Sequence, residues 1–229
     1  DPEMSRGLGD VYKRQVLLSG GLDSTVSVAS LIKDVKFELA LTFDYGQKSV
    51  LKEVAASKRI AEYYGIEHKV IKLDWLGEIT KTSLVSGEIP KIDMRQLDNI
   101  SVTQESCKDV WVPNRNGLFI NIAASFADSM DGACIVIGAN KEEAATFSDN
   151  SKQFIENINL SLEKSTAGEV KTVAPLIDLN KEEIVHRAIE LDVPLKLINS
   201  CYTDSQKHCG KCESCNRLKR ALIKCGKNE

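Results

Sequence analysis

The first third of the chain alternates between short apolar runs and stretches with helical spacing. Val16-Leu17-Leu18 and Phe37 to Phe43 predict two buried strands, and Glu67 to Leu73 alternates apolar and polar positions as a third strand does. Between these runs, helices are expected over Asp23 to Lys33, with one buried face, and over about Ser49 to Tyr64. This βαβαβ pattern is typical of a doubly wound α/β fold with a mainly parallel sheet.

The pattern is interrupted in the middle of the chain and then resumes. Trp75 to Val112 is polar and lacks periodicity, and because it is too long for an ordinary connection we predict a lid or insertion with short helical pieces. Asn180 and Glu183 are spaced as in a capping box, which marks a helix start. The elements expected after the insertion are a helix from about Leu118 to Met130, a strand over Cys134 to Gly138, a helix near Ser151 to Leu162, a strand near Val170 to Val173 and a helix from Asn180 to about Leu191. With the first three strands they complete a five-stranded sheet.

A chain of 229 residues is long enough for one sizeable α/β domain with a small appendage. We expect a disordered or non-native leader over residues 1–15, because glycine and proline are frequent there and no periodicity is visible. The α/β domain is predicted over 16–195 and a cysteine-rich helical tail over 196–229. The sequence contains neither an apolar run of membrane-spanning length nor a secretion signal, so we expect a cytoplasmic protein with no membrane partner.

The net charge of the chain bears on whether it binds nucleic acid. The 30 basic and 33 acidic residues leave a net charge of −3, which provides no general attraction for nucleic acid. We therefore expect a small-molecule substrate and no nucleic-acid partner.

A turn rich in glycine and hydroxyl groups, Ser19 to Ser24, lies directly between the first strand and the first helix. Gly20 and Gly21 have no Cβ, so backbone N–H groups can approach a phosphate closely, and the helix N-terminus beyond them favours an anion. A Walker A loop would place a lysine on the terminal phosphates, but no lysine occurs between Gln15 and Ile32. We predict a pyrophosphate loop, in which the α-phosphate of ATP is attacked; an ordinary strand-to-helix turn with a capping residue is the alternative.

Candidate site residues follow from this turn and from the edge of the sheet where parallel strands end. The Asp23 carboxylate can hold Mg²⁺ between the phosphates, since Mg²⁺ takes one or two carboxylates plus substrate oxygens, and it can also cap a helix. Arg115 precedes the fourth helix and Lys141 follows the fourth strand, where each can meet an α-phosphate or a carboxylate, or be a solvated charge. Asp23, Arg115 and Lys141 are the predicted catalytic residues. The residues expected to bind the nucleotide are Leu18, Ser19, Gly20, Gly21, Leu22, Asp23, Ser24, Asp44, Tyr45 and Gln47.

Four of the seven cysteines are crowded near the end of the sequence. Cys201, Cys209, Cys212 and Cys215 have the spacing C-x7-C-x2-C-x2-C, so four thiolates can converge on one ion. Zn²⁺ is the natural occupant, and four sulfur ligands leave no open position for water, which predicts a structural site. An iron–sulfur cluster and free thiols are the alternatives.

Several segments, taken in order, resemble the 7-cyano-7-deazaguanine synthase family. They are LLSGGLDST, TFDYGQ, WVPNRNGLFINIAAS, VAPLIDLNKEEIV and SCY followed by CGKCESC, and they extend from about Val16 to Leu222. The resemblance implies an adenine-nucleotide-hydrolase-like fold, a bound zinc and a homodimer. It also implies ATP-dependent conversion of 7-carboxy-7-deazaguanine and ammonia to the nitrile, in the biosynthesis of queuosine-type tRNA bases. Many members carry Gly-Tyr-Pro-Asp-Cys after the fourth strand, where this chain has Glu142 to Asn150, with Asp149 as the candidate replacement for that aspartate.

The chemistry of this conversion predicts two successive adenylations, from acid to amide and from amide to nitrile. Two other function classes remain open from the residues. One is a pyrophosphate-loop enzyme that adenylates another carboxylate or a base within tRNA, which would need a basic RNA-binding surface. The other is a zinc-containing nucleotide sensor that binds ATP without turnover.

Overall fold

The computed structural model describes residues 13–130, 133–167, 169–205 and 207–227. Its five strands form one sheet in the order β3-β2-β1-β4-β5, and every neighbouring pair is parallel. The strands are β1 (Lys13–Leu17), β2 (Phe37–Asp44), β3 (Glu67–Lys72), β4 (Ala133–Val136) and β5 (Lys171–Val173). This is a doubly wound order, with the reversal of strand order between β1 and β4. The predicted α/β fold class is confirmed.

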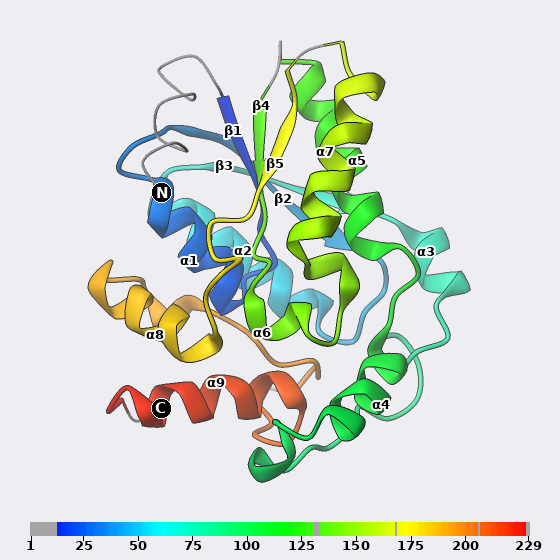
Figure 1. The fold of residues 1–229 in the computed structure, drawn as a ribbon, viewed down its shortest axis with the longest axis vertical. Helices are drawn as coiled ribbons and strands as arrows, with labels where there is room; N and C mark the ends of the chain where they lie inside the picture. Colours follow the sequence, from blue (N-terminus) through cyan, green and yellow to red (C-terminus); the bar gives the residue numbers. More distant parts are fainter. Residues whose placement is uncertain (1–12, 131–132, 168, 206, 228–229) are drawn as a thin grey trace.

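Helices cover both faces of the sheet (Figure 1). The α-helices are α1 (Leu22–Leu31), α2 (Val50–Tyr64), α3 (Asp74–Ile79), α4 (Ile100–Val110), α5 (Arg115–Asp128), α6 (Lys141–Ala144), α7 (Lys152–Ser165), α8 (Lys181–Glu190) and α9 (Glu213–Lys224). Short 3-10 helices span Met94–Gln96, Ser148–Asn150 and Leu195–Leu197. Successive residues of β2 point to opposite faces: Leu41 and Phe43 join the core beneath α5 and α7, and Ala40 joins the core beneath α1 and α2.

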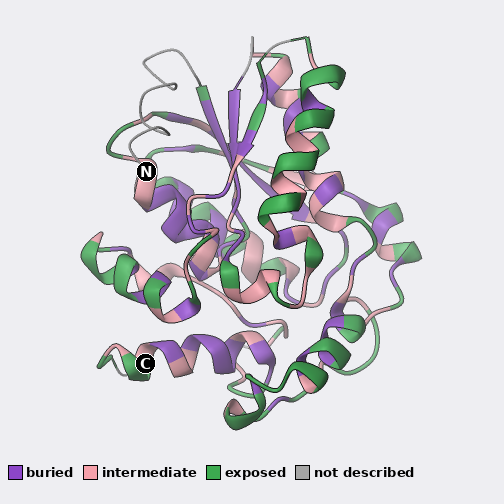
Figure 2. Cartoon of the chain, in the orientation of Figure 1, coloured by how far each residue is buried: buried purple, intermediate pink, exposed green. Residues whose placement is uncertain are grey.

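The first helix, α1, is buried on almost every side, as Figure 2 shows. Val28 packs against the sheet, whereas Leu22 and Val26 pack against residues of α8 and α9. The prediction of one buried face was wrong, because local periodicity does not reveal the outer layer that α8 and α9 add over α1.

The predicted insertion and the tail pack against each other. Lys91 pairs with Cys212 in an isolated antiparallel bridge, and the backbone N–H of Ile92 donates to the carbonyl of Lys211 at 3.1 Å. The Asn216 side chain donates to the Ile92 carbonyl at 2.5 Å. The insertion contains α3 and α4, as the expected short helical pieces. It therefore braces the cysteine-rich segment of the tail.

The start of the described chain differs from the expectation. β1 begins at Lys13, two positions before the predicted end of the leader at residue 15, and residues 1–12 lie outside the described residues. Lys13 to Gln15 belong to the sheet because they pair with β4.

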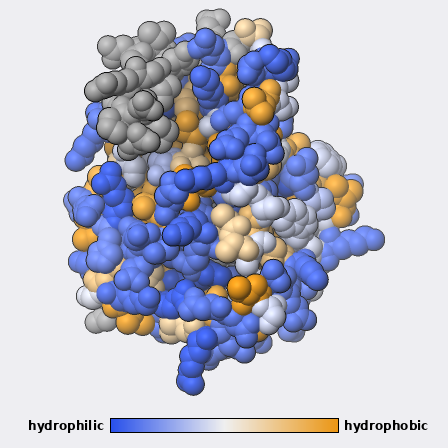
Figure 3. All heavy atoms as spheres, viewed as in Figure 1, coloured by the Kyte–Doolittle hydropathy of each residue, from blue (hydrophilic) through white to orange (hydrophobic). Residues whose placement is uncertain are grey.

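The described part of the chain holds no helix that combines the length and the apolar character needed to cross a bilayer. The face of the molecule in Figure 3 is largely hydrophilic, with apolar side chains in small separate groups.

Candidate active site

A cavity of about 250 Å³ lies at the carboxyl ends of the central strands, beside the point where the strand order reverses. Open parallel sheets bind ligands at this position. The nucleotide-binding candidates that line it are Leu18, Ser19, Gly21, Leu22, Asp23, Ser24, Tyr45 and Gln47. Arg115 joins them from α5, and the tail contributes Asn199, Ser200, Tyr202 and Ser214. The cavity is thus built from the predicted loop and also from the tail.

Three predicted site residues are not among those that line the cavity. Gly20 lies in the loop between β1 and α1 and faces α2, where a Cβ would approach Ala56. The Asp44 carboxylate accepts from the backbone N–H of Gly46 at 3.1 Å, so it stabilises the turn after β2. Lys141 is exposed at the start of α6, and its backbone N–H donates to the carbonyl of Leu179.

The loop between β1 and α1 is held in shape by its own hydroxyl groups. Gly21 is the N-cap of α1, the Ser19 and Ser24 hydroxyls lie 3.2 Å apart, and the Thr25 hydroxyl donates to the Gly21 carbonyl at 2.7 Å. The tail fixes the same loop, because the backbone N–H of Asn199 donates to the Gly20 carbonyl at 2.7 Å. The first turn of α1 therefore presents its N–H groups at the cavity, as a phosphate site requires.

Gly20 cannot be replaced without strain. Its φ is +76°, and a Cβ there would lie 2.8 Å from the Ala56 Cβ and 3.0 Å from the Glu53 carbonyl oxygen. We expect Gly20→Ala to lower the free energy of unfolding by about 2 kcal/mol or more, the sum of a left-handed backbone cost and a steric clash. Gly87→Ala is the matched control, since Gly87 has a φ of +78° but open space around it. Equal losses in denaturant titrations of the two variants would show that the clash contributes nothing.

Lys181 brings a positive charge to the loop from a distant part of the sequence. Its Nζ lies 2.7 Å from Asp23 Oδ2 and 3.0 Å from Glu143 Oε1, and its side chain is 9% exposed. It is the only lysine among the described residues that line the cavity. Lys181 was not among the residues predicted from the sequence. The signal that could have indicated it is its place as the first residue of α8, directly after the correctly predicted Asn180 cap.

These three groups set one another's protonation. Burial lowers the pKa of Lys181, but Asp23 and Glu143 outweigh this and hold it above its ordinary value. Burial raises the pKa of Glu143, yet attraction to Lys181 outweighs it and the net pKa is lowered. Burial also raises the pKa of Asp23, and Lys181 offsets only part of that rise. The Lys181 ammonium is thus charged, and it is shared by the carboxylates of Asp23 and Glu143.

Asp23 retains the capacity to bind a cation. It does not cap α1, whose N-cap is Gly21 without a side-chain cap hydrogen bond. Its Oδ1 is buried and has no hydrogen-bond partner among the described residues. A carboxylate oxygen of this kind beside a phosphate loop fits a hard cation such as Mg²⁺.

Arg115 and a group of aromatic rings form another wall of the cavity. Asn114, in the left-handed conformation with a φ of 50°, precedes Arg115, which starts α5 earlier than the predicted Leu118. Burial raises the pKa of the Tyr45 phenol, although the positive charge of the nearby Arg115 guanidinium opposes the rise. Phe43 and Phe119 stack with centroids 3.9 Å apart. An arginine next to apolar rings suits a planar base that carries a carboxylate.

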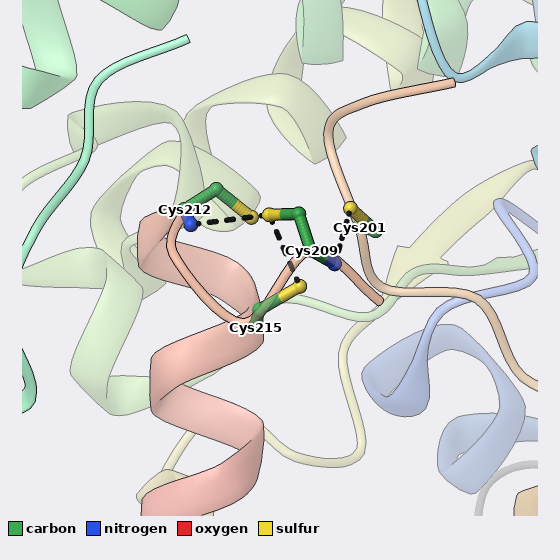
Figure 4. A group of neighbouring side chains, drawn as sticks. All are labelled: Cys201, Cys209, Cys212 and Cys215. Carbon is green, nitrogen blue, oxygen red and sulfur yellow. Dashed lines mark hydrogen bonds between the residues drawn. The ribbon is translucent and has the colours of Figure 1, made fainter. Parts of the chain in front are cut away.

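The four tail cysteines converge on one point, as Figure 4 shows. Their sulfur atoms all lie within 4.8 Å of one another. Four sulfurs at about 2.3 Å from a tetrahedral zinc ion lie about 3.8 Å apart, so the cluster can hold a metal such as zinc. Backbone N–H groups of Cys209 and Cys212 donate to sulfur atoms of Cys201 and Cys209 at 3.4 and 3.3 Å, which stabilises thiolates.

Comparisons with known proteins identify the family of this chain. A family model described as queuosine biosynthesis protein QueC matches residues 13–226. The chain belongs to this family. The 7-cyano-7-deazaguanine synthase of Carboxydothermus hydrogenoformans is 51% identical over 212 residues, which cover 91% of this chain and 97% of that protein. The enzyme of the same name from Methanosarcina barkeri is 47% identical over 219 residues, which cover 93% of this chain and 95% of that protein.

Membership of the QueC family confirms the resemblance found in the sequence. Among solved structures, NMN synthetase from Francisella tularensis matches with a TM-score of 0.53 at 15% identity, covering 95% of this chain and 78% of that one. At this identity the likeness shows the fold alone. The loop, the cysteine cluster and the sheet order are thus features of a chain that belongs to the QueC family and shares its fold with this NMN synthetase.

Proposed function

We propose that the protein is an ATP-dependent synthase that converts 7-carboxy-7-deazaguanine and ammonia to 7-cyano-7-deazaguanine, a step in queuosine biosynthesis. The observation that carries this proposal is a pyrophosphate-type loop with a buried lysine, Lys181, at the ligand-binding edge of a QueC-family chain. A loop without its own lysine suits the release of pyrophosphate rather than the transfer of the terminal phosphate.

Two adenylations account for the chemistry. A carboxylate oxygen of the substrate attacks the α-phosphorus of ATP and pyrophosphate leaves. Ammonia then attacks the carbonyl carbon, loses a proton, and AMP leaves with that oxygen, which gives the primary amide. In the second round the amide oxygen attacks the α-phosphorus of a new ATP, and pyrophosphate leaves again. AMP then departs with that oxygen as the nitrogen loses its two protons, and the C≡N bond forms.

Each described group has a role in these steps. The loop from Ser19 to Ser24 holds the departing pyrophosphate, and Lys181 offsets the charge that develops on the α-phosphate. Arg115 orients the substrate carboxylate. Asp23 would hold Mg²⁺, which neutralises phosphate charge when bound.

The remaining partners follow from the same proposal. Zn²⁺ on Cys201, Cys209, Cys212 and Cys215 has a structural role, because four thiolates leave no position for substrate. We expect free ammonia as the nitrogen donor, a homodimer as the assembly and the cytoplasm as the location. None of these requires a nucleic-acid surface.

The stoichiometry is the direct test. We expect two AMP for each nitrile, because both oxygens of the carboxylate must leave as AMP. The primary amide should appear transiently and, when supplied instead of the acid, should need one ATP and no ammonia. Chromatographic counting of AMP and ADP, with mass spectrometry of the base, measures both.

Different outcomes point to different errors. ADP as the main nucleotide product, or an amide that is never consumed, would refute double adenylation. AMP formed with a different carboxylate or with tRNA would move the protein to another pyrophosphate-loop activity, and ATP binding without turnover under all these conditions would favour a sensor.

A further inference from the structure

Arg217 is a buried arginine that lies outside the cavity lining but close to the groups that hold Lys181. It projects from α9, and its side chain is 8% exposed. Its guanidinium donates to Glu213 from Nε at 3.0 Å and from Nη2 at 2.8 Å, and to Glu142 from Nη1. Glu213 opens α9 and also accepts from the Ser106 hydroxyl of the insertion at 2.8 Å. Arg217 therefore joins the tail to α6, which lies next to α9 (Figure 1), and indirectly to the insertion.

Glu142 extends this connection to the start of α8. Its second oxygen accepts from the backbone N–H of Lys181 at 3.0 Å, one of the N–H groups that a helix start leaves without an intrahelical partner. The next residue, Glu143, accepts from the Nζ of the same lysine at 3.0 Å, and that Nζ lies 2.7 Å from Asp23. Two adjacent carboxylates of α6 thus hold Lys181 at its backbone and at its ammonium.

We propose that Arg217 is a positioning residue for Lys181, a role that rests on the function proposed above. Without the guanidinium, the Glu142 and Glu213 carboxylates lose a buried cationic partner, and among the described cationic side chains only Arg220 still contacts Glu142, at 3.1 Å. A buried carboxylate without its partner is costly, so α6 shifts to hydrate it and the Lys181 ammonium moves as well. A displacement of about 1 Å of a catalytic group is enough for about a 10²-fold loss of rate.

The first test uses Arg217→Met in the full chain. We expect kcat for AMP formation to fall about 10- to 100-fold, and ATP affinity, measured by calorimetry without the second substrate, to weaken. The kcat of Arg217→Lys should lie between those of the parent chain and of Arg217→Met, because an ammonium keeps the charge but cannot make the forked contacts of a guanidinium. Lys224→Met is the matched control: it removes another α9 ion pair, in which exposed Lys224 lies 2.9 Å from partly exposed Glu182 of α8, and it should leave kcat and ATP affinity unchanged.

A double variant separates positioning from a loss of stability. If Arg217 acts through Lys181, adding Arg217→Met to Lys181→Met should cause no further loss of rate, whereas equal losses in both backgrounds would overturn the proposal. Glu142→Gln replaces Arg217→Met in the same comparison if the latter does not fold. Failure of the parent chain to form AMP would contradict the proposed function, while unchanged ATP affinity in Arg217→Met would contradict this inference alone.

Discussion

Lys181→Met is expected to slow AMP formation by about 10²- to 10³-fold, the range for removing one preorganised charge from a developing anion. The ammonium is buried beside the pyrophosphate loop, and negative charge accumulates on the α-phosphate as the substrate oxygen attacks. No lysine within the loop can replace it, because none lies between Gln15 and Ile32. Single-turnover measurement of AMP, with ATP and acid both saturating, reports this step without product release.

The control for this prediction is a solvent-exposed lysine–aspartate ion pair with a similar distance. Lys152 lies 2.7 Å from Asp178, and both side chains are largely exposed, so Lys152→Met should leave the rate unchanged. Thermal unfolding of Lys181→Met must be measured as well, because Asp23 and Glu143 lose their shared cation and one of them will take up a proton. A loss of rate in Lys141→Met, with a normal rate in Lys181→Met, would contradict this prediction. It would show that the catalytic lysine is Lys141, the residue predicted from the sequence.

Lys141 and Lys181 illustrate which parts of the site can be predicted from the sequence and which cannot. The loop from Leu18 to Ser24 was predictable because glycine, hydroxyl and strand signals coincide within a few residues. A catalytic lysine was expected after the fourth strand, yet the structure places an ammonium from the start of α8 at the loop. Asp23 and Lys181 are 158 positions apart, and periodicity within a segment carries no information about which distant segment packs beside it.

The same limit applies to the tail. Its cysteine spacing predicted that four thiols can converge on one ion, and the structure confirms that the four sulfur atoms lie together. This was predictable because ligand type and spacing are local properties. Two other features of the tail depend on long-range contacts, which the sequence does not reveal. Tyr202 and Ser214 line the cavity, and α9 packs on α8 and α1. The sequence therefore predicted a structural metal site in a separate tail, whereas in the structure the tail also forms one wall of the cavity.

Because the tail forms one wall of the cavity, we expect two consequences when one cysteine of the proposed zinc site is removed. We expect Cys212→Ser to lower the zinc content below one ion per chain and to lower the melting temperature by several degrees, because binding free energy of a structural metal is folding free energy. The tail should loosen before the sheet unfolds, since the central strands have their own core. ATP affinity should weaken along with it, because Asn199 of the tail fixes the Gly20 carbonyl at 2.7 Å.

Cys225→Ser is the matched control for this change. Cys225 follows the end of α9, outside the four-cysteine cluster, and the same substitution there should leave zinc content, melting temperature and ATP affinity as in the parent chain. Elemental analysis, thermal unfolding and calorimetry of the two variants measure these quantities. A Cys212→Ser protein that keeps a full complement of zinc and its melting temperature would show that Cys212 is not a ligand. One that loses zinc but keeps its ATP affinity would separate the cluster from the cavity, because the loop would then hold its shape without an ordered tail.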